Sequence, residues 1–173
     1  CLSSEFDNPN GVPISAFVFG GRREKLTPLV YQSKSWNNGV FVGSIMGSET
    51  TAAATGAVGV VRRDPMAMLP FCGYNMGDYW KHWIEIGETL DEDKAPKIFN
   101  VNWFRKDEDG NFLWPGFGDN FRVLDWIIDR CEGKVDAQET AIGYLPYAKD
   151  INLEGLDMTE EEVDKILDVD KDA

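Results

Sequence analysis

The chain has 173 residues and a mass of 19.4 kDa, which is a typical size for one domain. Its 43% hydrophobic and 27% charged residues exclude the disordered and collagen-like classes. The formal net charge of −13 and the lack of an apolar run as long as a membrane span argue against nucleic acid or a membrane as a partner.

Strands, one helix and a loop are predicted in the first part of the chain. Residues 12–19 are apolar and end at two glycines, which predicts a buried strand, and residues 29–31 predict a second short strand. Ser35 is a suitable N-cap for a helix that continues to about Met46. Residues 48–59 have small side chains and are predicted to form a mobile loop.

The second part is predicted to contain three helices and two strands. A helix over 77–86 is followed by a strand over 98–104 and, after an Asp109-Gly110 hairpin turn, by a returning strand over 112–114. A second helix covers 120–131 and ends at Gly133. A capping box at Thr159 and Glu162 begins a last helix, which continues to Leu167. No linker divides the chain. We therefore predict one domain of mixed α/β (α+β) class, a mixed sheet with packed helices, with a core at about 10–150 and an acidic helical tail at about 151–173.

The segment Phe19-Gly20-Gly21-Arg22-Arg23 is the first candidate binding element. Two glycines at the end of a strand let the backbone approach a ligand closely, and an arginine offers a planar set of donors suited to phosphate oxygens. A glycine turn followed by two solvated arginines is the structural alternative.

An aromatic segment over residues 102–120 is the second candidate. Its five rings are Trp103, Phe104, Phe112, Trp114 and Phe117. A flat base stacks on such rings, and the carboxamide of Asn120 has both a donor and an acceptor for a purine edge. A hairpin whose rings face the core remains the alternative.

The third candidate is the small-residue loop itself. A segment of Ser, Thr, Ala and Gly gains little from packing when open, which suits a lid that closes over a ligand and excludes water. A plain surface loop is the alternative.

The cysteines and the histidine limit what the chain does alone. Cys1, Cys72 and Cys131 form no CxxC pair, which favours a reducing compartment, and the N-terminus shows no signal peptide. We therefore expect a cytoplasmic protein. The single histidine, His82, lies in an aromatic-rich segment that is predicted to form a helix face, and it is interpreted as structural. One histidine also cannot form a multi-histidine metal site.

Read in order, these motifs resemble the C-terminal part of GTP-dependent phosphoenolpyruvate carboxykinases. The resemblance covers about residues 10–150. It is carried above all by Phe19-Gly20-Gly21-Arg22-Arg23, by Ser48-Glu49 with Thr51-Ala52-Ala53-Ala54, by Val101-Asn102-Trp103-Phe104-Arg105-Lys106-Asp107 and by Phe112-Leu113-Trp114-Pro115-Gly116-Phe117-Gly118. The resemblance implies the C-terminal nucleotide-binding domain of a lyase that converts oxaloacetate and GTP to phosphoenolpyruvate, GDP and CO2 in gluconeogenesis.

The resemblance also implies roles for particular residues. Arg22 would contact the phosphates, Phe104, Phe112 and Phe117 would enclose guanine with Trp103 behind them, and the edge of the base would be read by Phe117, Gly118, Asp119 and Asn120. The implied Ω-loop lid consists of Glu49, Thr50, Thr51, Ala52, Ala53, Ala54, Thr55, Gly56, Ala57, Val58 and Gly59.

The family's other functional elements are not found in this sequence. No Gly-Lys-Thr phosphate loop is present, and the family's ligands for Mn2+ or Mg2+ lie upstream of the matching part. We therefore expect a piece of a longer chain that needs the N-terminal remainder as its partner, holds no catalytic or metal-binding residue and is inactive alone. The rival hypothesis is a stand-alone module whose aromatic cleft binds a sugar or a peptide.

Overall fold

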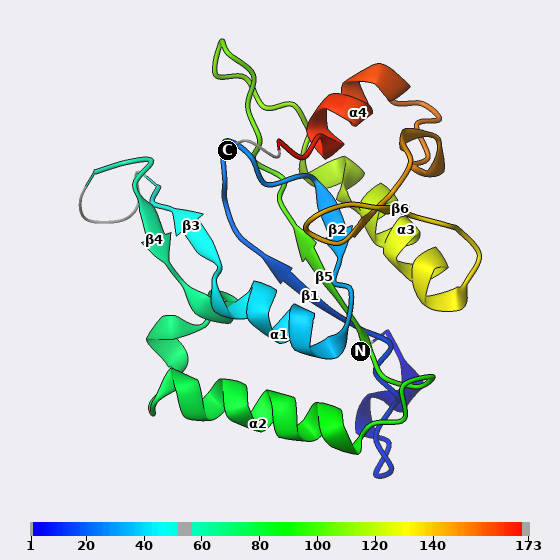
Figure 1. The fold of residues 1–173 in the computed structure, drawn as a ribbon. Helices are drawn as coiled ribbons and strands as arrows, with labels where there is room; N and C mark the ends of the chain where they lie inside the picture. Colours follow the sequence, from blue (N-terminus) through cyan, green and yellow to red (C-terminus); the bar gives the residue numbers. More distant parts are fainter. Residues whose placement is uncertain (1, 52–56, 171–173) are drawn as a thin grey trace.

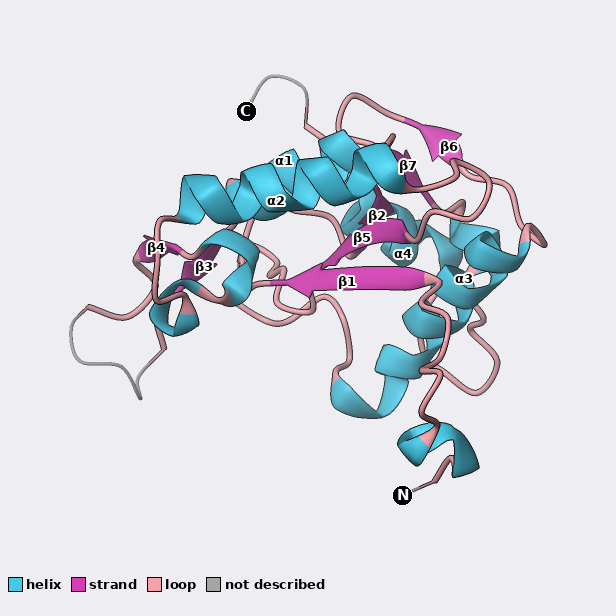
Figure 2. Ribbon diagram, turned by 90° about the horizontal axis from the view of Figure 1, so that it is seen from below, coloured by secondary structure: helices cyan, strands magenta, loops and turns pink. Residues whose placement is uncertain are grey.

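The computed structural model describes residues 2–51 and 57–170, which form a mixed five-stranded sheet with helices on both faces (Figures 1 and 2). The strand order is β1-β5-β2-β7-β6, with β1 and β5 parallel and the other neighbours antiparallel. The strands are β1 (Ala16–Gly20), β2 (Val30–Gln32), β5 (Lys97–Val101), β6 (Gln138–Glu139) and β7 (Tyr144–Leu145). This arrangement confirms the predicted mixed α/β class.

Two pairs of helices cover the sheet. Figure 2 shows α1 (Trp36–Ser44) and α2 (Met76–Thr89) on one face, and α3 (Asn120–Glu132) with α4 (Glu160–Leu167) on the other. A Cβ atom at Gly39 would lie 2.5 Å from the Ile98 side chain, so the absence of a side chain there lets α1 approach β5 closely. On the opposite face, Phe99 and Trp126 meet edge to face, with ring centroids 6.0 Å apart.

The main hydrophobic core lies between the sheet and the second pair of helices. Its buried members are Leu29, Val30, Phe99, Val101, Trp114, Val123, Trp126, Ile127, Leu145, Ala148, Ile151, Val163, Ile166 and Leu167. Because β5 is covered on both faces, four of its five residues are buried rather than alternating between core and solvent. The last helix of the acidic tail contributes three of these core residues, Val163, Ile166 and Leu167.

Predictions that rest on local capping signals are confirmed. The Ser35 hydroxyl accepts a hydrogen bond from the Asn38 backbone N–H at the start of α1. Gly133 ends α3 in the left-handed region with a φ of 69°. Thr159 and Glu162 form the predicted capping box, in which each side chain accepts a backbone N–H of the other residue.

Several predicted strand boundaries are wrong, because the ends of these strands depend on contacts with segments that are distant in the sequence. The first strand begins at Ala16 rather than at residue 12, because its partner β5 begins at Lys97, which pairs with Ala16. The strand predicted to reach residue 104 ends at Val101, since Asn102 turns away to bind the loop after β1.

The returning strand predicted over 112–114 is reduced to one antiparallel bridge, between Lys106 and Phe112. A two-stranded hairpin formed by β3 (Gly47–Glu49) and β4 (Val61–Arg63) was not predicted. Its first strand includes Ser48 and Glu49, which were assigned to the mobile loop. Residues 52–56 of that loop lie outside the described part of the chain.

Candidate functional site

The predicted aromatic residues meet around one cavity of about 390 Å³. Its lining consists of Trp103, Phe104, Phe112, Trp114, Pro115, Gly116, Phe117 and Asn120. Phe104 and Phe112 come from the two sides of the 105–112 turn and contact each other edge to face, with centroids 6.0 Å apart. Phe117 is 95% exposed and Phe112 is 57% exposed. These two rings are therefore available to a ligand and are not part of the core.

Trp114 lies at the base of this cavity and orients Asn120. The indole ring is buried in the core, and its Nε1–H donates to Asn120 Oδ1 over 2.9 Å. This hydrogen bond fixes the orientation of the carboxamide, whose amide nitrogen donates no hydrogen bond within the described residues and is therefore available as a donor to a ligand. Between these residues, Gly116 takes a φ of 114°, a conformation that side chains disfavour, and the chain then turns into α3.

Two of the predicted base-reading residues do not line the cavity. Gly118 is absent from its wall, and the Asp119 carboxylate accepts a hydrogen bond from Arg122 Nε over 2.9 Å. Arg122 also donates to the backbone oxygens of Asn152 and Glu154. Asp119 therefore belongs to an ion-pair network that anchors the start of α3 in this structure.

Arg22 lies beside a different cavity. The backbone N–H of Arg22 donates to Ser48 Oγ over 3.1 Å, and its Nε donates to the Glu49 carbonyl over 3.1 Å. With Arg62, Asp64 and Phe71 it lines a cavity of about 300 Å³ that shares no lining residue with the aromatic cavity. The structure thus brings the rings together and places the arginine against β3.

Asn102, for which the sequence predicts no particular role, links these two regions. Its side chain is only 1% exposed. The amide nitrogen donates to the carbonyls of Arg23 and Thr27 over 2.8 and 2.9 Å, while Oδ1 accepts from the N–H groups of Arg23 and Phe104 over 3.1 and 3.2 Å. One buried carboxamide therefore fixes both the arginine turn and the first ring of the aromatic cavity. The only hint in the sequence was an amide side chain at the end of a buried strand.

The described ends of the predicted lid segment form the continuation of the β3–β4 hairpin. Thr50 N–H donates to the Val60 carbonyl, and Gly59 N–H donates to the Thr50 carbonyl, each over 3.0 Å. The Thr50 hydroxyl also donates to the Ala57 carbonyl. Thr50 thus joins the two ends of the segment, whose residues 52–56 lie outside the described range.

We predict that Gly59→Pro opens this hairpin end. Gly59 has a φ of 78° and donates its N–H to Thr50, whereas proline fixes φ near −65° and has no N–H. We expect amide hydrogen exchange at Thr50 and Val60 to accelerate at least about tenfold, which corresponds to a loss of about 1.4 kcal/mol of local opening free energy. Gly110→Pro, at another positive-φ glycine, is the matched control, and unchanged exchange in Gly59→Pro would contradict the hairpin geometry.

The chain's ionisable groups do not assemble a metal site in the part that is described. Across residues 2–51 and 57–170, no group of three or more His, Cys, Asp or Glu side chains is placed to hold a metal ion. In the same ranges, no helix is both long enough and apolar enough to cross a membrane.

This chain is similar in sequence to known proteins over nearly its whole length. The whole chain, residues 1–173, matches the family described as the phosphoenolpyruvate carboxykinase C-terminal P-loop domain. It is 59% identical to the GTP-dependent phosphoenolpyruvate carboxykinase of Renibacterium salmoninarum over 169 residues, and 57% identical to those of Treponema pallidum and Paenarthrobacter aurescens over 170 and 169 residues. The chain belongs to the GTP-dependent phosphoenolpyruvate carboxykinase family, which confirms the resemblance found in the sequence.

These alignments cover nearly all of this chain but little of its relatives. Each of the three includes 98% of this chain and 28% of the relative's length. The sequence contains no Gly-Lys-Ser or Gly-Lys-Thr segment, so the phosphate loop after which the domain is named is not among these 173 residues.

Proposed function

We propose that this chain is the guanine-binding part of a GTP-dependent phosphoenolpyruvate carboxykinase, which converts oxaloacetate and GTP to phosphoenolpyruvate, GDP and CO2. The observation that carries the proposal is the aromatic cavity of about 390 Å³, which two exposed rings and three less exposed rings line. Beside them lies the Asn120 carboxamide, whose nitrogen donates no hydrogen bond within the described residues. Family membership favours a nucleotide as the occupant over the sugar or peptide of the rival hypothesis.

In this proposal the rings bind the base and Asn120 recognises it. Stacking on an aromatic ring contributes about 1–3 kcal/mol per base. The Asn120 amide donates to an acceptor on the base, such as the carbonyl oxygen of guanine, whereas adenine presents an amino group at that position. The proposed roles of Gly118 and Asp119 are limited to holding Phe117 and Asn120 in place, because neither lines the cavity.

Arg22 is proposed to contact the phosphate groups. Phosphoryl transfer depends mainly on positioning and on the stabilisation of charge, which a guanidinium supplies. Mn2+ or Mg2+ would add further charge stabilisation. The described residues offer no set of metal ligands, so we derive no step through such an ion. The metal ligands and the oxaloacetate site are proposed to lie in the rest of the polypeptide, which is the proposed partner of this chain. In this proposal the chain is inactive alone and functions in the cytoplasm. Residues 49–59 keep their proposed role as a lid.

A fluorescence titration tests the base-binding role. The complete polypeptide that carries these residues is titrated with GTP, ATP and a neutral oligosaccharide while tryptophan emission is recorded. We expect Phe117→Ala to weaken GTP binding about tenfold or more, because one stacking surface is lost, with little change in stability since the ring is 95% exposed.

The matched control is Phe6→Ala. Phe6 is 73% exposed and is distant from Phe117 in the sequence. Equal affinity for GTP in the parent and Phe117→Ala would overturn the assignment of this cavity. A response to the oligosaccharide alone would favour the sugar-binding rival.

A further inference from the structure

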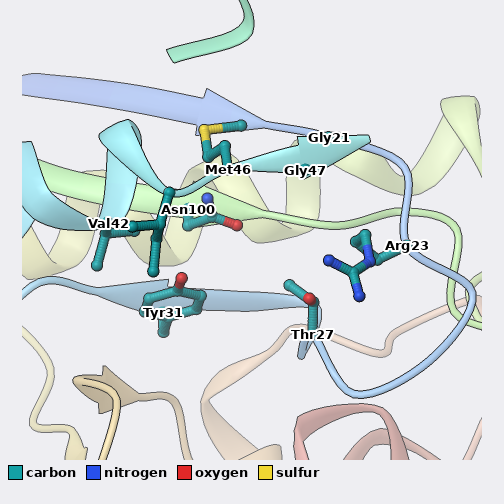
Figure 3. A pocket seen from close by; sticks show the side chains of 9 residues that line it. Gly21, Arg23, Thr27, Tyr31, Val42, Met46, Gly47 and Asn100 are labelled. Atoms are coloured by element: carbon teal, nitrogen blue, oxygen red, sulfur yellow. The ribbon is translucent and has the colours of Figure 1, made fainter. Parts of the chain in front are cut away.

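A small cavity of about 130 Å³ lies between α1 and the sheet, apart from the aromatic cavity proposed to bind guanine (Figure 3). Four of its lining residues carry polar side chains, namely Arg23, Thr27, Tyr31 and Asn100. Figure 3 shows the Arg23 guanidinium and the Tyr31 hydroxyl directed into the space from two sides, with the Asn100 carboxamide between them. None of these residues lines the aromatic cavity.

None of these four side chains forms a hydrogen bond within the described part of the chain, and the one ion pair among them joins Arg23 to Glu49. Asn100 is 5% exposed, yet neither end of its carboxamide forms a hydrogen bond there. Arg23 Nε is buried without an acceptor, and the nearest carboxylate oxygen, Glu49 Oε1, is 3.9 Å away. Buried polar groups are normally satisfied, and leaving one unsatisfied costs about 1–3 kcal/mol. Of these groups, Arg23 Nε is the one that is both buried and without a hydrogen-bond acceptor in the described residues. The Tyr31 hydroxyl and the Asn100 carboxamide face the cavity, where an occupant that supplies acceptors would meet them.

The positive charge of Arg23 and the hydrogen-bond donors that line the cavity favour a negatively charged ligand. The guanidinium carries a full positive charge and presents its two terminal nitrogens to the space. Burial raises the pKa of Tyr31 to about 12, so its hydroxyl stays protonated and able to donate at neutral pH. Within residues 2–51 and 57–170, Glu49 is the one carboxylate that forms an ion pair with Arg23; it approaches the Nε edge, and the terminal nitrogens donate no hydrogen bond in these ranges.

The volume of the cavity and its apolar wall indicate which kind of anion fits. A single water needs far less than 130 Å³, so the cavity has room for a ligand of several heavy atoms. The other side of the space is apolar, formed by Val42, Ile45 and Met46. A phosphate ion would present oxygens to this wall without partners, whereas a short carboxylate would place its alkyl group there.

We propose that this cavity is a binding site for a small aliphatic carboxylate. The carboxylate accepts hydrogen bonds from the terminal nitrogens of Arg23 and from the Tyr31 hydroxyl and the Asn100 amide, and the alkyl group contacts Val42, Ile45 and Met46. The cavity adjoins the one that Arg22 lines, because Gly21 and Met46 line both, but Arg22 itself lines only the other cavity and donates its Nε–H to the Glu49 carbonyl.

Saturation-transfer NMR with propionate on the complete polypeptide tests the proposal without any nucleotide. We expect saturable binding of propionate, about tenfold weaker in Tyr31→Phe because one hydrogen bond to a charged group is lost, and undetectable in Arg23→Met. Tyr147→Phe, at a tyrosine outside the cavity, is the matched control and should bind as the parent does. Thermal unfolding of each variant shows that the fold is retained, and Tyr31→Phe is decisive if Arg23→Met does not fold.

Three results would overturn the proposal. These are no saturable transfer to propionate, equal affinity in the parent and Tyr31→Phe, and displacement of propionate by inorganic phosphate at a concentration below the propionate dissociation constant. The last result would replace the carboxylate with a phosphate group. Because GTP is absent from the titration, failure here leaves the proposed guanine site unaffected, and failure of the guanine site leaves this result unaffected.

Discussion

In the complete enzyme, Arg22→Ala is expected to lower kcat by about 100-fold while changing stability only slightly. Removing one preorganised donor to developing charge typically costs 10²- to 10³-fold in rate, or about 3–4 kcal/mol. In the described structure the Arg22 side chain makes one hydrogen bond, from Nε to the Glu49 carbonyl, and losing it removes only about 1 kcal/mol of folding free energy. Steady-state kinetics and urea unfolding of the same preparations measure both effects.

The control for Arg22 is Arg63→Ala, which removes an exposed arginine from β4. It should leave both kcat and the unfolding free energy close to the parent values. If Arg22→Ala reduces stability and turnover by comparable free energies, Arg22 is a structural residue that holds β3 against the turn after β1, and the proposed phosphate contact is wrong.

The parts of the fold that were predicted correctly depend on short segments. The cap at Ser35, the left-handed glycine at 133 and the capping box at Thr159 each use hydrogen bonds or backbone conformations within a few residues. Strand ends depend instead on where a distant partner begins or ends. The start of β1 depends on Lys97, and the end of β5 depends on the loop that Asn102 binds, so neither was visible in the local pattern.

The difference between local and distant contacts also explains which features of the candidate site could be predicted from the sequence. Phe104, Phe112 and Phe117 occur in one short segment, and their gathering around a cavity follows from that segment's own turns. The orientation of Asp119 toward Arg122 depends on a network that reaches Asn152 and Glu154, about thirty residues away along the chain. The polar cluster at Arg23, Tyr31 and Asn100 brings together the paired strands β2 and β5 and the loop between β1 and β2, so it depends on strand pairing between distant segments.

Asn102→Ala is expected to destabilise the protein by about 3 kcal/mol or more, because it removes a buried carboxamide that makes four hydrogen bonds to backbone groups of three partly buried residues. Asn111→Ala is the matched control. The Asn111 side chain is exposed and donates to the carboxylate of Asp107 in the turn, so its loss should cost less than about 1 kcal/mol. Urea unfolding of both variants measures the difference, and similar losses would show that the buried carboxamide contributes little.

Asn102→Asp separates the two halves of this interaction. The carboxylate retains oxygens that accept from Arg23 and Phe104 N–H, but it cannot donate to the carbonyls of Arg23 and Thr27. If these two donated hydrogen bonds position the arginine turn, Asn102→Asp in the complete enzyme should lower kcat while leaving the binding of guanosine, which lacks phosphates, within about twofold of the parent. A loss of guanosine binding equal to the loss of kcat would mean that Asn102 positions the rings and not the arginine turn, because Phe104 is its only partner in the aromatic cavity.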